Sequence, residues 1–322
     1  MSSPAGPNGF AIVDKEAGWT SHDVVARARK LLNTRKVGHG GTLDPPATGV
    51  LVLGVGRGTK LLRFITELPK TYVATFRLGT ETTTLDAEGE VTASHDMAGV
   101  DLQDVRRAAA TFVGDIEQIP PMVSAVKVGG KRLHELARAG VEVERKPRPV
   151  TIHELRIDAT PSSSAGDVEA DAETVGERRY ESDAAQGGAE AHGHDFVMVV
   201  TCSSGTYIRT LAADIGAALG GGAHVRDLRR TAIGPFDESM ARPLEQIELL
   251  SLADGLVGRP VVVVGGDTLA AIGHGKVLPR DLLDTDADGP WAIVDETGAL
   301  QAVYESHKGD TVKPAVVVAP AG

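Results

Sequence analysis

Residues 36–49 read KVGHGGTLDPPATG, and this stretch decides how the rest of the chain is interpreted. It places a single carboxylate, Asp44, among glycine, threonine and proline, with little side-chain surface to bury. Pro45 and Pro46 fix their own φ angles, and each pushes the residue before it toward an extended conformation. The surrounding glycines permit positive φ angles and close approach of another backbone. The stretch therefore predicts a rigid loop around one carboxylate, which by local pattern alone is either a turn-capping or a functional aspartate.

The bulk composition is that of an ordinary globular protein. The chain has 322 residues, enough for one large domain or two unequal ones, with 42% hydrophobic and 24% charged residues. It has no apolar run of membrane-spanning length, and MSSPAGPNGF at the N-terminus lacks the features of a signal peptide. The single cysteine, Cys202, excludes an internal disulfide and fits a reducing cytoplasm. We also expect no metal site, because the histidines show no HExxH-like spacing.

Charge is distributed unevenly along the chain. The net charge is −11, yet residues 1–80 carry 11 Lys and Arg against 5 Asp and Glu. Residues 160–195 carry 2 Arg against 9 acidic residues, and residues 246–322 carry 5 basic against 11 acidic residues. A basic N-terminal third beside acidic later segments is either ordinary surface variation or the footprint of a polyanionic partner.

One segment interrupts an otherwise structured pattern. Residues 160–195 are rich in Ser, Ala, Gly and Glu and poor in aromatic and β-branched residues, which predicts a disordered acidic insertion. It separates VTIHELRI (150–157) from FVMVVTC (196–202), two strand-like runs that we expect to be neighbours in a sheet. An acidic tract of this kind should lie away from any polyanion.

The remaining pattern interleaves helices and strands. SHDVVARARKLLN predicts a helix with Ser21 as its N-cap, TYVATFRLG (71–79) alternates as a strand, and DLQDVRRAAATFV and GTYIRTLAADIGAAL predict helices. Several strands are joined by short turns rather than helical crossovers, which favours an α+β fold with a mixed sheet. PVVVV (260–264), WAIVD and PAVVVAP predict a small β-rich unit at the C-terminal end.

A phosphate-loop enzyme is disfavoured by GVGRGTK (54–60), because Thr59 precedes Lys60 where the motif requires Gly-Lys-Ser/Thr. Instead, KVGHGGTLDPPATGVLVLGVGRGTK closely resembles the catalytic motif of the TruB-type tRNA pseudouridine synthases. Further matches follow the order of that family from about residue 9 to residue 245. They are GFAIVDKEAGWTSHDVV, KTYVATFRLG, TLDAEGEV, QIPPMVSAVKVGGKRLHELAR, CSSGTYIRTLAADIG and GAHVRDLRRTAIGPF.

The resemblance implies an enzyme that isomerises uridine-55 to pseudouridine in the T loop of tRNA, without cofactor or metal. Asp44 matches the family's catalytic aspartate, which either attacks the sugar or removes a proton from it. Arg209 matches the arginine that pairs with that aspartate, and its fork could bind the carboxylate in two places. Tyr72 matches the aromatic residue that stacks on the flipped target base, and the alternative is a core tyrosine on a strand.

The same resemblance assigns substrate contacts to four further residues: His39, Lys15, Tyr207 and Leu228. His39 would enter the T loop, Tyr207 would line the pocket wall, and Leu228 would pack on the pocket. Departures from the family pattern are Glu16, Val123, His134 and Thr83. The arginines of VRDLRR and the basic helix segment ARARK are expected to contact phosphates.

The predicted domains are a pseudouridine synthase catalytic domain over 9–245 and a PUA-like domain over 260–322. The expected fold is α+β, with a mixed, largely antiparallel central sheet. The expected partner is the tRNA T arm, bound by a monomer mainly through the catalytic domain. The alternatives are an RNA-folding protein on this scaffold, a guide-RNA-dependent synthase of the dyskerin type, and an unrelated glycosidase. The last would want paired carboxylates, and the sequence shows one in a rigid setting.

Overall fold

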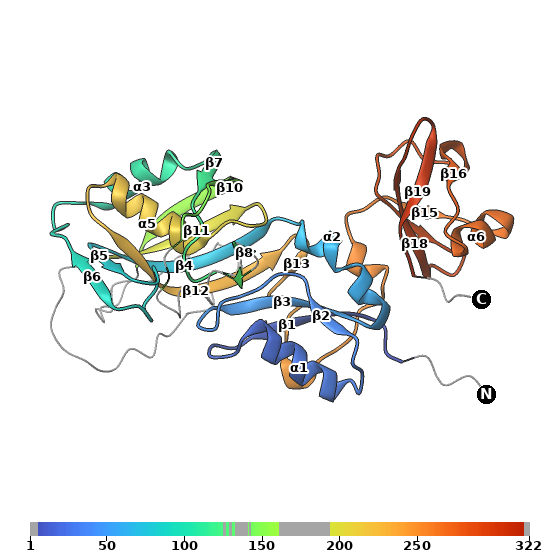
Figure 1. The fold of residues 1–322 in the computed structure, drawn as a ribbon, viewed down its shortest axis with the longest axis horizontal. Helices are drawn as coiled ribbons and strands as arrows, with labels where there is room; N and C mark the ends of the chain where they lie inside the picture. Colours follow the sequence, from blue (N-terminus) through green and yellow to red (C-terminus); the bar gives the residue numbers. More distant parts are fainter. Residues whose placement is uncertain are drawn as a thin grey trace, which may run out of the picture.

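The computed structural model describes residues 6–124, 127–128, 131–132, 141, 143–160 and 194–318. These residues form a large lobe that contains most of the chain and a small β-rich lobe, built from its C-terminal part, at one end (Figure 1). The predicted insertion over 160–195 falls mainly on residues 161–193, which lie outside the described residues. His134 lies outside them as well.

The large lobe is built on a ten-stranded sheet whose main path is β14-β1-β3-β12-β4-β11-β10-β7. The pairs β1–β14 and β3–β12 are parallel and the other pairs are antiparallel, so the predicted α+β class with a mixed, largely antiparallel sheet is confirmed. The strands are β1 (Gly9–Lys15), β2 (Val37–His39), β3 (Thr48–Val55), β4 (Lys70–Leu78), β7 (Gly114–Gln118), β10 (Arg148–Ala159), β11 (Asp195–Cys202), β12 (Ala223–Ile233), β13 (Phe236–Asp237) and β14 (Arg242–Pro243).

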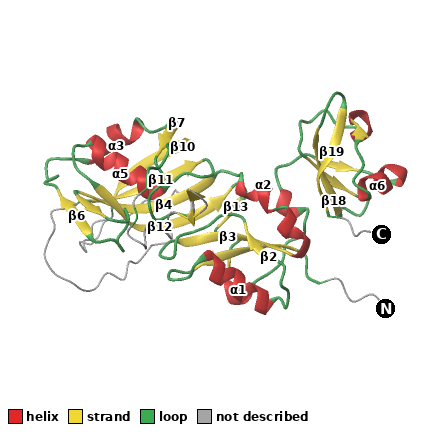
Figure 2. Ribbon diagram, viewed as in Figure 1, coloured by secondary structure: helices red, strands yellow, loops and turns green. Residues whose placement is uncertain are grey.

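Two hairpins lie beside this sheet, and four helices belong to the large lobe in the described part of the chain (Figure 2). The hairpin strands are β5 (Thr80–Thr82) with β6 (Val91–Ser94), and β8 (Lys127–Val128) with β9 (Lys131–Arg132). The helices are α1 (Ser21–Leu31), α2 (Leu62–Thr66), α3 (Leu102–Ala110) and α5 (Ile208–Ala218).

The central strands form because their side chains alternate between the core and the outer face. Along β4 every second residue is buried, as the alternation in the sequence predicts. Phe76, Met198 and Leu211 bring β4, β11 and α5 into one apolar core, to which α3 also contributes. The site described below lies on this part of the sheet.

The pairing of the strands that flank the insertion is confirmed. β10 and β11 are antiparallel neighbours, with Ala159 opposite Phe196. Asp195 is the first residue of β11, so the structured strand begins one residue before the predicted run and the insertion ends before Asp195. The Asp195 carboxylate pairs with Arg77 at 2.8 Å and with Arg226 at 2.5 Å.

Helix α1 occupies the predicted residues, but its predicted N-cap is wrong. Thr20 is the N-cap, and with Asp23 it forms a reciprocal capping box. Ser21 is buried instead, where its Oγ accepts from the Leu43 amide at 2.9 Å. Two neighbouring residues could both cap this helix, and the one further along the chain is used to hold the segment before Asp44.

The small lobe has its own sheet and core. Five strands follow the order β15-β17-β18-β19-β16 around a core that includes Trp291 and Tyr304, so the predicted β-rich C-terminal unit is confirmed. Its elements are β15 (Val261–Val263), α6 (Gly266–Gly273), β16 (Leu278–Pro279), β17 (Trp291–Val294), β18 (Leu300–Ser306) and β19 (Thr311–Val317).

The two lobes share an apolar cluster. Phe64 of α2 packs in one cluster with Val294 and Val303 of the small lobe, and the Arg57 guanidinium donates to the Val318 carbonyl at 2.9 Å. None of the helices in the described part of the chain combines the length and apolar character that a membrane span requires.

Candidate active site

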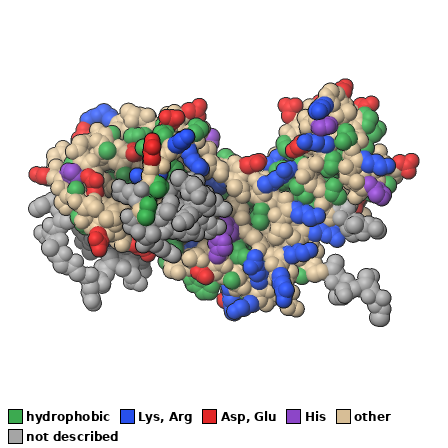
Figure 3. All heavy atoms as spheres, viewed as in Figure 1, with side chains coloured by type: hydrophobic (Ala, Val, Ile, Leu, Met, Phe, Trp, Pro, Cys, Tyr) green, Lys and Arg blue, Asp and Glu red, His purple; other side chains and the backbone are tan. Residues whose placement is uncertain are grey.

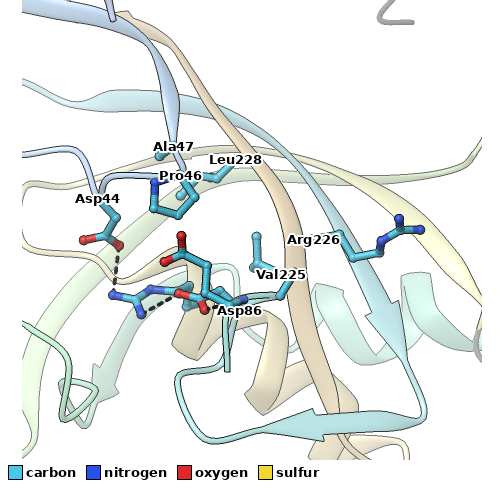
Figure 4. Close-up of a pocket in the computed structure, with 10 residues that line it drawn as sticks. Asp44, Pro46, Ala47, Asp86, Val225, Arg226 and Leu228 are labelled. Carbon is cyan, nitrogen blue, oxygen red and sulfur yellow. Dashed lines mark hydrogen bonds and ion pairs between the residues drawn. The ribbon is translucent and has the colours of Figure 1, made fainter. Parts of the chain in front are cut away.

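A hollow with about 360 Å³ of space, part of it open to solvent, lies where four parts of the large lobe meet (Figure 4). The loop between β2 and β3 contributes Asp44, and the turn after β5 contributes Asp86. Arg209 enters from the first turn of α5, and β12 contributes Leu228 and Arg226, whose guanidinium points away from Asp44 (Figure 4). The predicted residues Asp44, Arg209 and Leu228 therefore line one pocket, although they are far apart in the sequence.

The loop that carries Asp44 is held by the backbone around it. The Ala47 amide donates to the Asp44 carbonyl at 3.1 Å, which closes a turn over the two prolines. The Gly18 amide donates to the Pro45 carbonyl at 2.9 Å. These bonds fix the loop while the Asp44 side chain remains 39% exposed, so its carboxylate is open to a ligand.

Lys15 fixes the same loop from beneath. Its side chain is 1% exposed, and its ammonium donates to the Pro45 carbonyl at 3.0 Å and to the Ala47 carbonyl at 2.6 Å. Burial lowers the pKa of Lys15 to about 8, against the opposing effect of the Asp44 charge. The expected substrate contact is not what the geometry offers, because Lys15 faces the protein backbone and not the open side of the pocket.

Arg209 pairs with Asp44 as expected, but not in the expected geometry. Its Nη2 lies 2.8 Å from Asp44 Oδ2, and its Nη1 lies 2.9 Å from Asp86 Oδ2. The dashed lines of Figure 4 mark both ion pairs. The fork is thus divided between two carboxylates, and the predicted two-pronged contact with Asp44 alone is wrong. The guanidinium also donates to the Thr84 and Val123 carbonyls, so the 6% exposed side chain is held on every side.

Asp86 is the site residue that the sequence analysis missed. It is buried in the turn TLDAEGEV, where its carboxylate accepts from the Thr84 hydroxyl and from the Glu88 amide at 3.2 Å. TLDAEGEV resembles the corresponding stretch of the family, but the resemblance gave no role to Asp86. A second carboxylate therefore lines the pocket, but it is saturated by Arg209 and its own turn.

Neither of the two expected tyrosines is among the side chains that line the pocket. Tyr72 on β4 is 9% exposed, and burial raises the pKa of its hydroxyl. Tyr207 is the N-cap residue of α5, and burial raises the pKa of its hydroxyl as well. Gln118, a buried residue, accepts from the Tyr207 amide at 2.9 Å and donates to its carbonyl at 3.3 Å. Tyr72 packs in one apolar cluster with Leu43 and Ala47, which flank Asp44. Tyr207 precedes Arg209 by two residues at the start of α5.

His39 lies at the end of β2 and is not among the side chains that line the pocket. Its ring meets the His22 ring edge-on at a centroid distance of 5.4 Å. Burial lowers the pKa of His39, with His22 acting in the same direction, so a neutral ring is favoured at pH 7.

The expected phosphate contacts divide into two groups. In VRDLRR, Arg226 pairs with Asp195, Arg229 pairs with Asp14 and Glu238, and Arg230 is buried, so the expectation fails for this cluster. The basic helix differs, because Arg29 and Lys30 are exposed. On the face drawn in Figure 3, Lys and Arg side chains gather on the lower part of the surface, below the notch between the two lobes.

Within the described ranges, no group of three or more His, Cys, Asp or Glu side chains is arranged to hold a metal ion.

Two family models match the chain. The model of the TruB family pseudouridylate synthase N-terminal domain matches residues 29–175. The model of the tRNA pseudouridylate synthase B C-terminal domain matches residues 209–255. The matched ranges contain Asp44, Tyr72, Asp86 and Arg209.

Curated relatives cover almost the whole chain. The tRNA pseudouridine synthase B of Arthrobacter sp. (strain FB24) is 42% identical over 327 residues, which is 97% of this chain and 97% of the relative. That of Rhodococcus jostii (strain RHA1) is 45% identical over 320 residues, 97% of this chain and 94% of the relative. Among solved structures, a chain of a Cbf5-Nop10-Gar1 complex superposes with a TM-score of 0.67 at 24% identity, covering 100% of this chain and 92% of that one. At that identity the likeness shows the fold alone.

Proposed function

The chain belongs to the TruB family of pseudouridylate synthases, and we propose that it isomerises uridine-55 in the T loop of tRNA with Asp44 as the catalytic carboxylate. At the coarser level the protein is an isomerase that forms pseudouridine in tRNA. The observation that carries the assignment of Asp44 is its ion pair with Arg209, because a partly exposed carboxylate is held there by a buried guanidinium at 2.8 Å.

The reaction needs one well-placed carboxylate and no change in the composition of the nucleotide. The bond between N1 of uracil and C1′ of the ribose breaks, and a bond between C5 of the same base and C1′ forms. The proton on C5 is lost and N1 gains one. Asp44 either attacks the sugar or removes a proton from it, and both roles use the ionised carboxylate that pairs with Arg209.

The target base has to leave its stack to be rearranged, which requires a pocket for a single nucleotide. We place the flipped nucleotide in the hollow that Asp44, Arg209 and Leu228 line, because it is open to solvent beside the Asp44 carboxylate. Leu228 supplies an apolar wall. We assign Tyr72 as the stacking platform and Tyr207 as a neighbouring wall. Because Tyr72 is 9% exposed in the free protein, entry of the base must uncover its ring.

The proposed partner surface for the T arm includes exposed basic residues of α1 and of the segment that follows it. Arg29, Lys30, Arg35 and Lys36 are exposed on α1 and the segment that follows it. Such residues bind phosphates and position the RNA without reading its sequence. The small lobe is acidic, so we assign most of the affinity to the large lobe. We further propose that a monomer acts, with the T loop reached by His39, and that it acts in the cytoplasm.

The rival functions make different demands on the pocket. A glycosidase uses two carboxylates in separate roles, whereas Asp86 is already bound by Arg209, Thr84 and the Glu88 amide. An RNA-folding protein would need neither the Asp44–Arg209 pair nor the pocket around it.

The proposal is tested by mapping pseudouridine in tRNA from cells that lack this protein, with complementation by the wild type and by Asp44→Asn. We expect pseudouridine-55 to disappear, to return with the wild type, and to stay absent with Asp44→Asn. Loss of pseudouridine at another tRNA position, with position 55 unchanged, would overturn the assignment of the site of modification.

A further inference from the structure

Arg230 is a buried guanidinium that contacts the loop bearing Asp44, and the proposed chemistry gives it no role. It is 1% exposed and, among the residues that the structure describes, no carboxylate forms an ion pair with it. Burying a charge without a counter-charge is costly unless hydrogen bonds satisfy the group. The hydrogen-bond partners of Arg230 therefore show what its buried charge stabilises.

Each of the three nitrogens of Arg230 donates to a different backbone carbonyl. Nη2 donates to Gly41 at 3.1 Å and Nη1 donates to Thr42 at 3.2 Å, in the loop that leads to Asp44. Nε donates to Val50 at 2.8 Å, in the strand that follows the loop. The guanidinium therefore ties together the two ends of the loop that carries Asp44.

The backbone of Arg230 is equally fixed. In the sheet, Arg230 lies opposite Gly49 of β3 on one side and opposite Tyr72 of β4 on the other. A Cβ atom at Gly49 would meet the Arg230 carbonyl oxygen at 2.2 Å, and Gly49 has a φ of +101°, so only glycine allows this approach. Arg230 thus lies between β3, which follows the Asp44 loop, and β4, which carries Tyr72.

The side chains of Arg230 and Tyr72 also interact. Directly opposite residues of an antiparallel pair present their side chains on the same face. Burial raises the pKa of the Tyr72 hydroxyl, and the positive charge of the Arg230 guanidinium acts in the opposite direction.

We propose that Arg230 is a positioning residue for the reaction, which clamps the loop bearing Asp44 against the strand bearing Tyr72. Its consequence for rate rests on the function proposed above, whereas the clamp itself is a property of the free protein. Arg230 touches neither the solvent nor the pocket lining, so it acts through the residues that it holds.

The test compares Arg230→Lys with a matched control at the next residue, Arg229→Lys. Arg229 is a partly buried arginine of the same strand that bonds both oxygens of Asp14, at 2.9 and 2.8 Å, and it lies outside the Asp44 loop. Lysine keeps the charge at either position, but one ammonium cannot replace three separated nitrogens.

Two measurements are made on each variant: hydrogen exchange of the 36–50 segment without RNA, and the single-turnover rate together with the tRNA dissociation constant. For Arg230→Lys we expect exchange in 36–50 to be at least tenfold faster. We also expect the rate to fall roughly tenfold to a thousandfold, with the dissociation constant unchanged within about threefold. For Arg229→Lys we expect exchange in 36–50 and the rate to stay close to wild type.

Normal exchange in 36–50 with a normal rate for Arg230→Lys would overturn the proposal. So would faster exchange spread evenly through the large lobe, because that result describes a general stabilising residue. If Arg230→Lys does not fold, Arg230→Gln removes the buried charge and keeps one donor group, and the same outcomes apply. Hydrogen exchange is measured without RNA, so it tests whether Arg230 holds the Asp44 loop independently of the proposed function. Turnover by Asp44→Asn would overturn that function and leave the exchange result valid.

Discussion

Arg209 meets Asp44 through a single guanidinium nitrogen, with Nη2 2.8 Å from Asp44 Oδ2. The other terminal nitrogen of Arg209 belongs to Asp86. The orientation of the Asp44 carboxylate therefore depends on a chain of two ion pairs, of which the inner one is almost fully buried. Loss of either pair should disturb the position of the Asp44 carboxylate.

Arg209→Lys should therefore be far more harmful than a conserved charge suggests. A lysine ammonium is a point charge and cannot reach Asp44 and Asp86 with the spacing of the guanidinium fork. Disrupting a buried charge pair costs about 2–5 kcal/mol. The single-turnover rate should fall by roughly tens to thousands of fold, while the tRNA dissociation constant changes little.

Arg77→Lys is the matched control for that substitution. Arg77 bonds both oxygens of Asp195, at 2.8 and 3.1 Å, outside the pocket. It should lose a comparable contact and keep its rate. If Arg209→Lys instead kept a normal rate and lost binding, Arg209 would be a phosphate contact and its pairing with Asp44 would not matter for the chemistry.

Asp86→Asn tests the inner ion pair. The amide keeps the size of the side chain and removes its charge, so Arg209 loses one of its two anchors. We expect the single-turnover rate to fall about tenfold with little change in tRNA affinity. Glu88→Gln is the control, because Glu88 lines the same pocket, is exposed and forms no ion pair with Arg209. Equal rates for the two variants would show that Asp86 has no part in positioning.

Asp44→Asn should abolish isomerisation and leave tRNA affinity within a few-fold of wild type. The amide is the same size and cannot act as nucleophile or base, while contacts to phosphates supply most of the affinity. Pseudouridine formation in a purified preparation is measured under single-turnover conditions beside a binding assay. Measurable turnover by a clean preparation would exclude Asp44 as the catalytic group.

The pKa of Lys15 predicts how stability depends on pH. Burial lowers this pKa from 10.5 to about 8 in the folded protein, so between these values the unfolded chain holds a proton that the folded chain has lost. Raising the pH from 8 to 9.5 should therefore favour the folded wild type over Lys15→Met by about 2 kcal/mol. Urea unfolding of both proteins at the two pH values gives the difference. A difference that is independent of pH would mean that Lys15 titrates normally.

Much of the fold could be predicted from local patterns. Alternation along 71–79 and the apolar runs at 150–157 and 196–202 predicted strands β4, β10 and β11, because period-two burial is written directly in the sequence. The pairing of Asp44 with Arg209 came only from the family resemblance. No local pattern connects a loop aspartate with an arginine at the start of a distant helix.

The residues that hold the site could not be predicted, for a physical reason. Lys15 and Arg230 are buried cations satisfied by backbone carbonyls, and every residue has a carbonyl, so their partners leave no trace in residue types. The arginines of VRDLRR were predicted to contact phosphates because the sequence does not show which of them are buried. Neighbouring arginines on a strand point to opposite faces, and only the tertiary structure shows which face is buried.

The last prediction concerns the segment between β10 and β11. Replacing residues 161–193 by a short Gly-Ser linker should leave the fold and the activity largely intact. Ala159 and Phe196 are already paired across the two strands, so a short turn can join them, and the entropy of closing a loop changes only slowly with its length.

The exact end of the deletion matters, because Asp195 pairs with both Arg77 and Arg226. A deletion that extends through Asp195 leaves two partly buried arginines without their carboxylate. It should therefore unfold at a temperature several degrees lower than the shorter deletion. Thermal unfolding and turnover of both variants provide the comparison. Aggregation or loss of turnover in the shorter deletion would mean that residues 161–193 contribute to the folded protein, whereas equal stability of the two deletions would remove Asp195 from any role in holding β4, β11 and β12 together.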